Sequence, residues 1–114
     1  MKLYYAPGAC SLSPHIALRE AGLRFEAIKV DLKSKAIAPS SGGGDFRALN
    51  SKGYVPALQL DDGTLLTEGP AIVQYIADLA PAAQLAPANG TLARYQLQSW
   101  LNFITSELHK QFSP

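Results

Sequence analysis

The sequence predicts an α/β domain built on a mixed four-stranded sheet, followed by one long helix. Three observations support this fold class: a strand, a helix and a strand open the chain, a hairpin and a helix follow, and a separate amphipathic run ends it. Of the 114 residues, 47% are hydrophobic, which is enough apolar material for a core. We therefore expect a sheet covered by helices.

The first unit is a strand, a helix and a second strand. Residues 2–5 (KLYY) form a β-rich run, and the run over 24–30 forms another, which we expect to be parallel to the first. Pro14 lacks an amide hydrogen and belongs in the first turn of a helix, so the helix begins within 10–13 and ends at Gly22. Its apolar stripe is Ile16, Ala17, Leu18 and Ala21.

The second unit begins after a Ser/Gly-rich stretch, 33–45, which predicts an exposed, flexible loop followed by a short helix over 45–50. Two β-rich runs joined by Asp-Asp-Gly predict an antiparallel hairpin over 54–67. A helix then follows over 68–80, with an expected buried face of Ile72, Val73, Ile76 and Leu79. The order βαβ then ββα is that of a thioredoxin-like domain, which we expect over 1–80.

A Pro/Ala-rich linker over 81–90 precedes the long helix predicted over 91–114. Its apolar face is expected to hold Leu97, Leu101, Ile104 and Leu108. A lone helix cannot bury both this face and Trp100, so we expect a further helical region, missing here or supplied by another chain.

Composition excludes several classes of function. Ten basic and nine acidic residues, without a basic cluster, do not suit a nucleic-acid-binding protein. The N-terminus lacks a secretory signal and no apolar run is long enough to cross a membrane, so we expect a cytoplasmic protein. The single cysteine excludes an internal disulfide, and His15 and His109 lack the spacing of metal ligands, so no metal is expected.

Cys10 lies at the predicted start of the first helix, where unpaired amides and the helix dipole favour a thiolate. The alternative is a buried, inert cysteine. Ser13 stands where a dithiol oxidoreductase has its second cysteine, so a disulfide can form only with an external thiol, most simply a small one.

Two further motifs suggest a ligand site. Pro56 at a strand start leaves a strand edge beside Val55 that suits a peptide-like ligand, or it is an ordinary strand-start proline. The amides of Glu68 and Gly69 at a helix start suit a ligand carboxylate, and the Glu68 side chain suits an ammonium, or the motif is a plain helix cap.

Polar residues share one face of the last helix: Asn102, Ser106 and His109, flanked by Glu107 and Lys110. They form either a solvated surface or one wall of a site that faces Cys10, and the spacing alone leaves both open.

Three stretches, YYAPGACSLSPHIALREAG, NSKGYVPALQLDDGTLLTEGPAIVQYIAD and WLNFITSELHK, resemble the bacterial beta-class glutathione transferases, and the similarity covers nearly the whole chain. In that family a thioredoxin-fold domain binds glutathione, and a larger helical domain supplies most of the pocket for a second, hydrophobic electrophilic substrate. The resemblance implies glutathione as co-substrate, a role in detoxification, no metal and a homodimer in the complete protein. It also implies that this chain ends in the first helix of the second domain and lacks most of the electrophile pocket.

The resemblance assigns roles to particular residues. Cys10 forms a mixed disulfide with glutathione, with Ser11 beside the sulfur, His109 from the last helix and Tyr5 in a secondary role. Pro56 is a cis-proline, Val55 pairs with the cysteinyl part of glutathione, and Lys35 reaches the glycyl carboxylate. The expected glutathione-binding residues are Ala9, Cys10, Lys35, Tyr54, Val55, Pro56, Glu68, Gly69, Asn102, Ser106, Glu107 and Lys110.

Two other functions remain open. The pattern of Cys10 and Ser13 also suits a monothiol glutaredoxin-like oxidoreductase, which would reduce glutathionylated substrates. A non-catalytic interaction module on the same fold is the third hypothesis, because a fold does not guarantee an activity.

Overall fold

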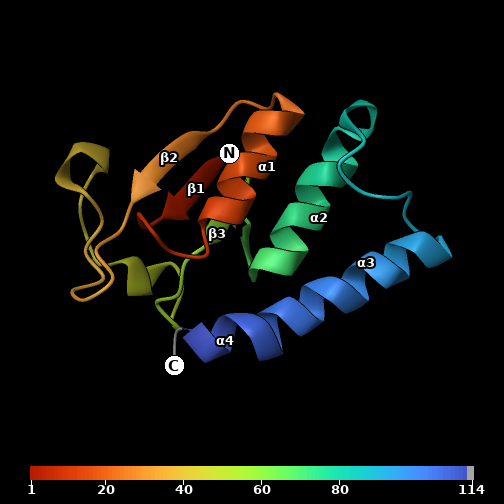
Figure 1. The fold of residues 1–114 in the computed structure, drawn as a ribbon. Helices are drawn as coiled ribbons and strands as arrows, with labels where there is room; N and C mark the ends of the chain where they lie inside the picture. Colours follow the sequence, from red (N-terminus) through yellow and green to blue (C-terminus); the bar gives the residue numbers. More distant parts are fainter. Residues whose placement is uncertain (113–114) are drawn as a thin grey trace.

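The computed structural model describes residues 1–112, so the last two residues of the predicted 91–114 helix lie outside the described part. The strands and helices follow one another in the expected order (Figure 1). The elements are β1 (Lys2–Tyr5), α1 (Leu12–Ala21), β2 (Glu26–Lys29), β3 (Ala57–Gln59), β4 (Leu65–Thr67), α2 (Gly69–Leu79), α3 (Leu92–Phe103), a π-helical turn η4 (Ile104–Leu108) and α4 (His109–Phe112). Three 3₁₀ turns, η1 (Pro39–Ser41), η2 (Phe46–Ala48) and η3 (Pro81–Ala83), lie in the connections.

The sheet has the strand order β2-β1-β3-β4. The β1 strand pairs with β2 in parallel and with β3 antiparallel, and the β3–β4 hairpin is antiparallel. At the centre of the sheet Leu3 pairs with Leu58, which pairs in turn with Leu66. The mixed, thioredoxin-like sheet predicted from the sequence is therefore confirmed.

The two faces of the sheet carry separate apolar clusters because successive strand residues point to opposite sides. On one face, Leu3 and Leu58 pack with Leu18 of α1 and with Ile72 and Ile76 of α2. The other face carries the fully buried Phe46, packed with residues that include Tyr4, Ala6, Ile28, Val30, Val55 and Ala57. Helices thus cover one face, and the loop before β3 covers the other.

The loop predicted as exposed is more structured than its composition suggests. Isolated bridges join Val30 with Ile37 and Ala36 with Asp45, η1 lies within the loop, and η2 follows it where the short helix was predicted. The side chain of Asp45 accepts the Arg47 amide at 2.9 Å and caps η2. The loop can therefore place Phe46 against the sheet.

The expected apolar faces of α1 and α2 need two corrections. Ile16 is 51% exposed, because it faces away from the sheet. It lines a groove that α1 and α2 form with Leu97 and Leu101. Leu79 is 45% exposed, because it lies in the last turn of α2, where the chain leaves the sheet, and Ala77 is buried instead. Val73 is half-buried.

Residues 91–112, which we call the arm, cross the ends of α1 and α2 (Figure 1). Arg94 is 2% exposed, and its Nε donates to the Pro87 carbonyl at 2.8 Å while its guanidinium pairs with both oxygens of Asp78. This pairing lowers the pKa of Asp78, chiefly through the hydrogen bond from Arg94. Nε2 of Gln98 donates to Oε1 of Gln74 at 2.9 Å. Polar contacts therefore hold the arm against α2.

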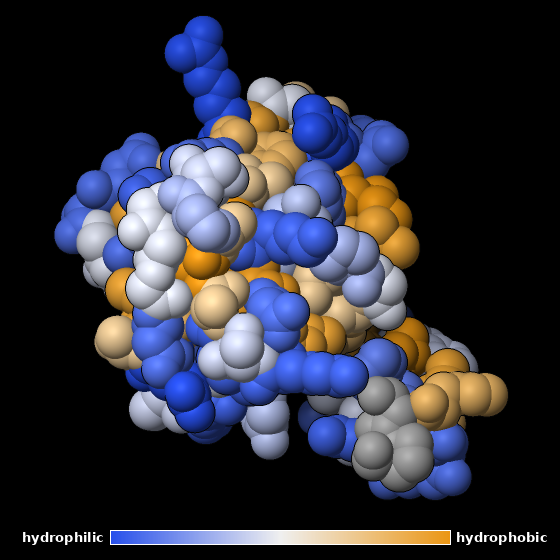
Figure 2. Space-filling view, turned by 90° about the vertical axis from the view of Figure 1, so that its left-hand side faces the viewer, coloured by the Kyte–Doolittle hydropathy of each residue, from blue (hydrophilic) through white to orange (hydrophobic). Residues whose placement is uncertain are grey.

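The arm leaves much apolar surface uncovered. Leu97 and Leu101 of its expected apolar face are half-buried, but Ile104 and Leu108 are exposed, because no other part of residues 1–112 covers them. The other large hydrophobic side chains that the arm exposes are Leu92, Tyr95, Trp100, Phe103 and Phe112. Hydrophobic surface is visible on the face of the molecule drawn in Figure 2. Beside these polar contacts, an apolar groove of about 250 Å³ lies between the arm and the helices α1 and α2.

Candidate functional site

Cys10 lies in the turn between β1 and α1, and α1 begins two residues later, within the predicted limits. Its side chain is exposed, and Sγ donates a hydrogen bond to the Val55 carbonyl at 3.3 Å. Two backbone hydrogen bonds shape the turn, from Ala9 to the Ala6 carbonyl at 3.2 Å and from Leu12 to the Ala9 carbonyl at 3.1 Å. The alternative of a buried cysteine is therefore wrong, whereas the reactivity of the thiol stays a prediction.

Ser11 directly follows Cys10, and its expected place beside the sulfur stays a prediction. It is 1% exposed, and its hydroxyl donates to the Ala6 carbonyl and accepts from the Ala6 amide, both at 3.1 Å. These two bonds close the turn that presents Cys10. The Ser11 hydroxyl is therefore committed to holding the loop.

Val55 and Pro56 lie directly opposite Cys10 and are joined by a cis peptide bond, as expected. Since β3 begins at Ala57 and lies between β1 and β4, the strand itself has no open edge. Val55 precedes the strand and is 8% exposed, and within residues 1–112 its amide donates no backbone hydrogen bond. An unpaired amide in a buried residue has a strong tendency to bind a partner.

The start of α2 completes this arrangement. A Cβ on Gly69 would lie 3.9 Å from Cγ of Pro56, so the first turn of α2 stands beside the cis-proline. Glu68 adopts a φ of 75°, and its side chain makes no capping hydrogen bond to the helix. Glu68 is therefore the N-cap residue of α2 without capping it through the side chain, and its exposed carboxylate is available beside the unpaired amides of the first turn.

Lys35 and Tyr54 border the loop that leads to Val55. Lys35 is half-buried and has a φ of 63°, while the Tyr54 side chain is 62% exposed. Asn50 is 7% exposed and donates from Nδ2 to the Tyr54 carbonyl at 2.9 Å. Asn50 was not among the site residues predicted from the sequence, although the turn residues that follow it were a usable signal.

Tyr5 packs away from this arrangement. Its ring lies 5.6 Å from the ring of His15, measured between centroids, and His15 in turn packs edge-on against Phe25 at 5.5 Å. Tyr5 also borders the helix-covered apolar cluster. No hydrogen bond joins Tyr5 to Cys10 in the described part of the chain.

The expected site residues of the arm are all exposed: Asn102, Ser106, Glu107, His109 and Lys110. The hydroxyl of Ser106 donates to the Asn102 carbonyl at 2.9 Å, within the arm itself. Over residues 1–112, no hydrogen bond or ion pair joins these side chains to Cys10, Val55 or Glu68. The structure thus brings together the three motifs of residues 1–80, which we call the sheet domain, whereas the contribution of the arm stays a prediction.

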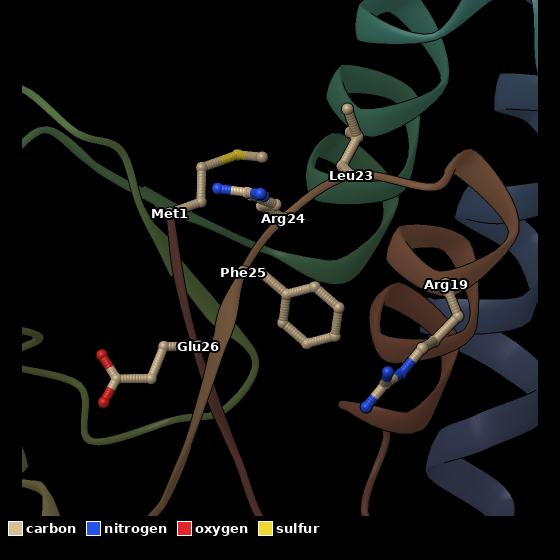
Figure 3. A pocket seen from close by; sticks show the side chains of 6 residues that line it. All are labelled: Met1, Arg19, Leu23, Arg24, Phe25 and Glu26. Atoms are coloured by element: carbon tan, nitrogen blue, oxygen red, sulfur yellow. The ribbon is translucent and has the colours of Figure 1, made fainter.

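A shallow hollow of about 460 Å³ lies elsewhere, at the end of α1 and the start of β2 (Figure 3). Its charged residues are Arg19, Arg24 and Glu26, and the Arg19 guanidinium lies 5.2 Å from the centre of the Phe25 ring. None of its lining residues is an expected site residue. Among residues 1–112, no group of three or more His, Cys, Asp or Glu side chains could hold a metal ion, and no helix is both long and apolar enough to cross a membrane.

The family described as the glutathione S-transferase N-terminal domain matches residues 8–79, and the chain therefore belongs to the glutathione S-transferase family. Among solved structures, a ternary complex of BphK, a bacterial transferase, is 70% identical, with a TM-score of 0.95 over 100% of this chain and 56% of its own. A beta-class transferase from Sphingomonas chungbukensis is 57% identical, with a TM-score of 0.93 over 98% of this chain and 54% of its own. Similarity at this level confirms the resemblance to the bacterial beta class.

Another solved relative is a sphingomonad glutathione S-transferase complexed with glutathione. It is 58% identical, with a TM-score of 0.92 over 98% of this chain and 54% of its own. The chain spans about half the length of the curated relatives it matches, among them the glutathione S-transferase GstA of Escherichia coli O157:H7, which is 54% identical over 114 residues, 100% of this chain and 55% of its own.

Proposed function

We propose that the chain binds glutathione between Cys10, Val55 and the first turn of α2. The observation that carries this proposal is the 3.3 Å contact between Cys10 Sγ and the Val55 carbonyl, which sets an exposed thiol beside an unpaired backbone amide. An extended peptide pairs with such a backbone through its own amide and carbonyl groups. The central residue of glutathione is a cysteine, so the same pairing would bring its thiol to Cys10.

The γ-glutamyl end of glutathione suits the start of α2. It carries a carboxylate and an ammonium on one carbon. The unpaired amides of the first turn and the positive end of the helix dipole attract the carboxylate, and the Glu68 carboxylate attracts the ammonium. Because Gly69 lies next to Pro56, a ligand that pairs with Val55 can reach both the first-turn amides of α2 and the Glu68 carboxylate.

The first reaction that we propose is thiol–disulfide exchange. After loss of its proton, the Cys10 sulfur attacks one sulfur of oxidised glutathione, a Cys10–glutathione disulfide forms, and the second glutathione leaves as a thiolate. No second cysteine exists in the chain, so release of Cys10 requires attack by another external thiol. The exposure of Cys10 supports this reaction because a bulky disulfide must reach the sulfur.

The second reaction is conjugation, in which the thiolate of bound glutathione attacks an electrophilic carbon. We propose that Asn102, Ser106, Glu107, His109 and Lys110 would border this reaction from the arm. The family assignment and the glutathione complex of the sphingomonad relative support it.

Mass spectrometry after incubation with oxidised glutathione tests the site. We expect the intact chain to gain one glutathionyl group at Cys10 and the Cys10→Ser variant to gain none. Ser13→Ala is the matched control, since Ser13 is exposed in the same region and should not affect the reaction. An unmodified Cys10 in the intact chain would rule out the exchange reaction.

The exposed thiol also favours a monothiol oxidoreductase as a second candidate. Release of glutathione from a glutathionylated peptide, together with no conjugation of a chromogenic electrophile, would identify that activity. Conjugation without such release would instead identify a transferase.

A further inference from the structure

We infer that Gly53 is a positioning residue, which holds the side chain of Lys35 in the orientation that reads the glycyl carboxylate of glutathione. This inference rests on the proposed function. Gly53 is buried and has a φ of 67°. A Cβ built on it would lie 3.2 Å from Cε of Lys35 and 3.3 Å from Cδ. The aliphatic part of Lys35 therefore lies on the bare backbone of Gly53.

The backbone of Lys35 is fixed on both sides. Its amide donates to the Asp31 carbonyl at 2.8 Å, and its own carbonyl accepts from the Phe46 amide at 2.8 Å. The Asp31 carboxylate accepts the amides of Lys33 and Ser34, both at 2.9 Å, which tightens the same turn. With its Cα held in this way, the direction of the Lys35 side chain depends on the surface on which it lies.

Gly53 is fixed in the loop that leads to the ligand-pairing residue. Its amide donates to the Asn50 carbonyl at 2.8 Å, and the Asn50 side chain holds the Tyr54 carbonyl. Val55, which contacts Cys10, is the next residue but one after Gly53. The position of Lys35 is thereby coupled to the backbone that pairs with glutathione.

The charges around Lys35 support a carboxylate as its partner. Arg47 also borders Gly53, with Cγ 3.4 Å from the built Cβ, but its guanidinium is paired with Asp45 at 2.9 Å. Within residues 1–112, Lys35 makes no ion pair and its ammonium donates no hydrogen bond. Of the two cations that contact Gly53, Lys35 is therefore the one whose ammonium can bind a ligand carboxylate, because the charge of Arg47 is already matched.

Equilibrium binding of glutathione, compared with glutathione esterified at the glycyl carboxylate, tests this role. The ester keeps the rest of the ligand but loses the charge that Lys35 would read. For the unaltered chain we expect about tenfold weaker binding of the ester, the usual size of a charged hydrogen bond. Asparagine tolerates a positive φ, so Gly53→Asn can keep the backbone conformation. Its side chain would displace Lys35, and the ratio of the two Kd values should fall close to one.

The controls separate positioning from folding. Gly22→Asn makes the same exchange at a φ of 69° with open space around it, so it should keep the tenfold ratio. Lys35→Met should lower the ratio to about one, and adding Gly53→Asn to it should produce no further change. Gly53→Ala, which adds only the Cβ, is the second variant if Gly53→Asn does not fold, and we expect a partial fall of about threefold in the ratio.

An unchanged ratio in both Gly53 variants would overturn the inference, and so would an equal loss of affinity for both ligands. Binding of neither ligand by the unaltered chain would be a different result, because it would overturn the proposed function as well. A selective loss of affinity for glutathione over its ester in Gly53→Asn supports the inference.

Discussion

The sheet domain, residues 1–80, and the arm differ in how they are held. Apolar clusters on both faces of the sheet hold the domain, with Leu3, Leu58 and Phe46 fully buried. The arm is held through the buried Arg94 and a few polar partners, and it exposes Trp100 to 66%. The motifs that the structure brings together, around Cys10, Val55 and Gly69, all belong to the sheet domain.

This difference indicates which residues of the proposed site are held in place by the core. We expect Cys10 and Val55 to keep their geometry, because Ala6 in the turn before Cys10, Val55 itself and Ala57 of the strand that follows it all belong to the core. The arm presents its polar residues on a helix whose apolar surface is largely uncovered. We therefore expect glutathione binding to depend on the sheet domain, and changes in the arm to affect the second substrate more than glutathione.

The largest difference should appear when one leucine is truncated in each region. Leu58→Ala removes a fully buried side chain between the two helices and the sheet, and should lower the free energy of unfolding by about 3 kcal/mol. Leu108→Ala, at 48% exposure in the arm, should lower it by less than about 0.5 kcal/mol. Urea denaturation measures both. Equal losses would contradict the contrast between the regions.

The next largest effect should come from Arg94→Met. It removes the hydrogen bonds to Pro87 and Asp78, and should weaken the docking of the arm against α2. Hydrogen exchange should then accelerate in α3 while β1 and β3 keep their protection. Arg94→Lys keeps the charge but loses the forked geometry of the guanidinium. The exchange rates of α3 in this variant should therefore lie between those of the unaltered chain and those of Arg94→Met. Uniform acceleration throughout the chain would show that the arm and the sheet domain unfold together.

Ser11→Ala should have a smaller effect, confined to the turn that presents Cys10. The change leaves the buried amide and carbonyl of Ala6 without the Ser11 hydroxyl, which should lower the free energy of unfolding by about 1.5 kcal/mol. Thermal unfolding measures it, and Ser13→Ala, at an exposed position in the first turn of α1, should be neutral. If the two variants unfold alike, the buried hydroxyl has no role in stability.

The smallest effect should be a pH dependence of arm docking. Because Arg94 lowers the pKa of Asp78 in the folded chain, this pair stabilises the fold above the ordinary carboxyl range, near pH 4, and the contribution is lost as pH falls through the lowered value. Asp31, Asp45 and Asp62 also have lowered pKa values, so the comparison must be with Asp78→Asn. The stability difference between the two chains should shrink below about pH 4. A constant difference down to pH 2 would contradict this assignment.

Much of the fold could be predicted because its signals are local. The periodicity of β1 and α1, the Asp-Asp-Gly turn and Pro14 and Pro70 each define an element without reference to the others. The burial of Leu79 was predicted wrongly, and Ile16 of the apolar stripe is also exposed, because helical periodicity identifies a face but not whether another element covers it. The degree of structure in the loop before β3 was underestimated, because composition does not reveal the bridges that place Phe46 on the sheet.

The motifs of the site could be predicted from the sequence, but the contacts that support them could not. The helix start at Cys10 and the strand start at Pro56 indicated a reactive thiol and a ligand-pairing backbone, and the 3.3 Å contact brings them together. The hydrogen bonds of Ser11 to Ala6 and the packing of Lys35 on Gly53 depend on the folded turn, so no pattern in the sequence predicted them.

The most direct test of the central claim is the response of backbone amide resonances to reduced glutathione in the isotopically labelled chain. We predict saturable shifts at Cys10, Val55, Gly69 and Ala71, while the amides of Leu3 and Leu58 in the core stay unchanged. Shifts that spare Val55 and Gly69, or no shifts at millimolar glutathione, would contradict the proposal that these elements of the sheet domain form the glutathione site.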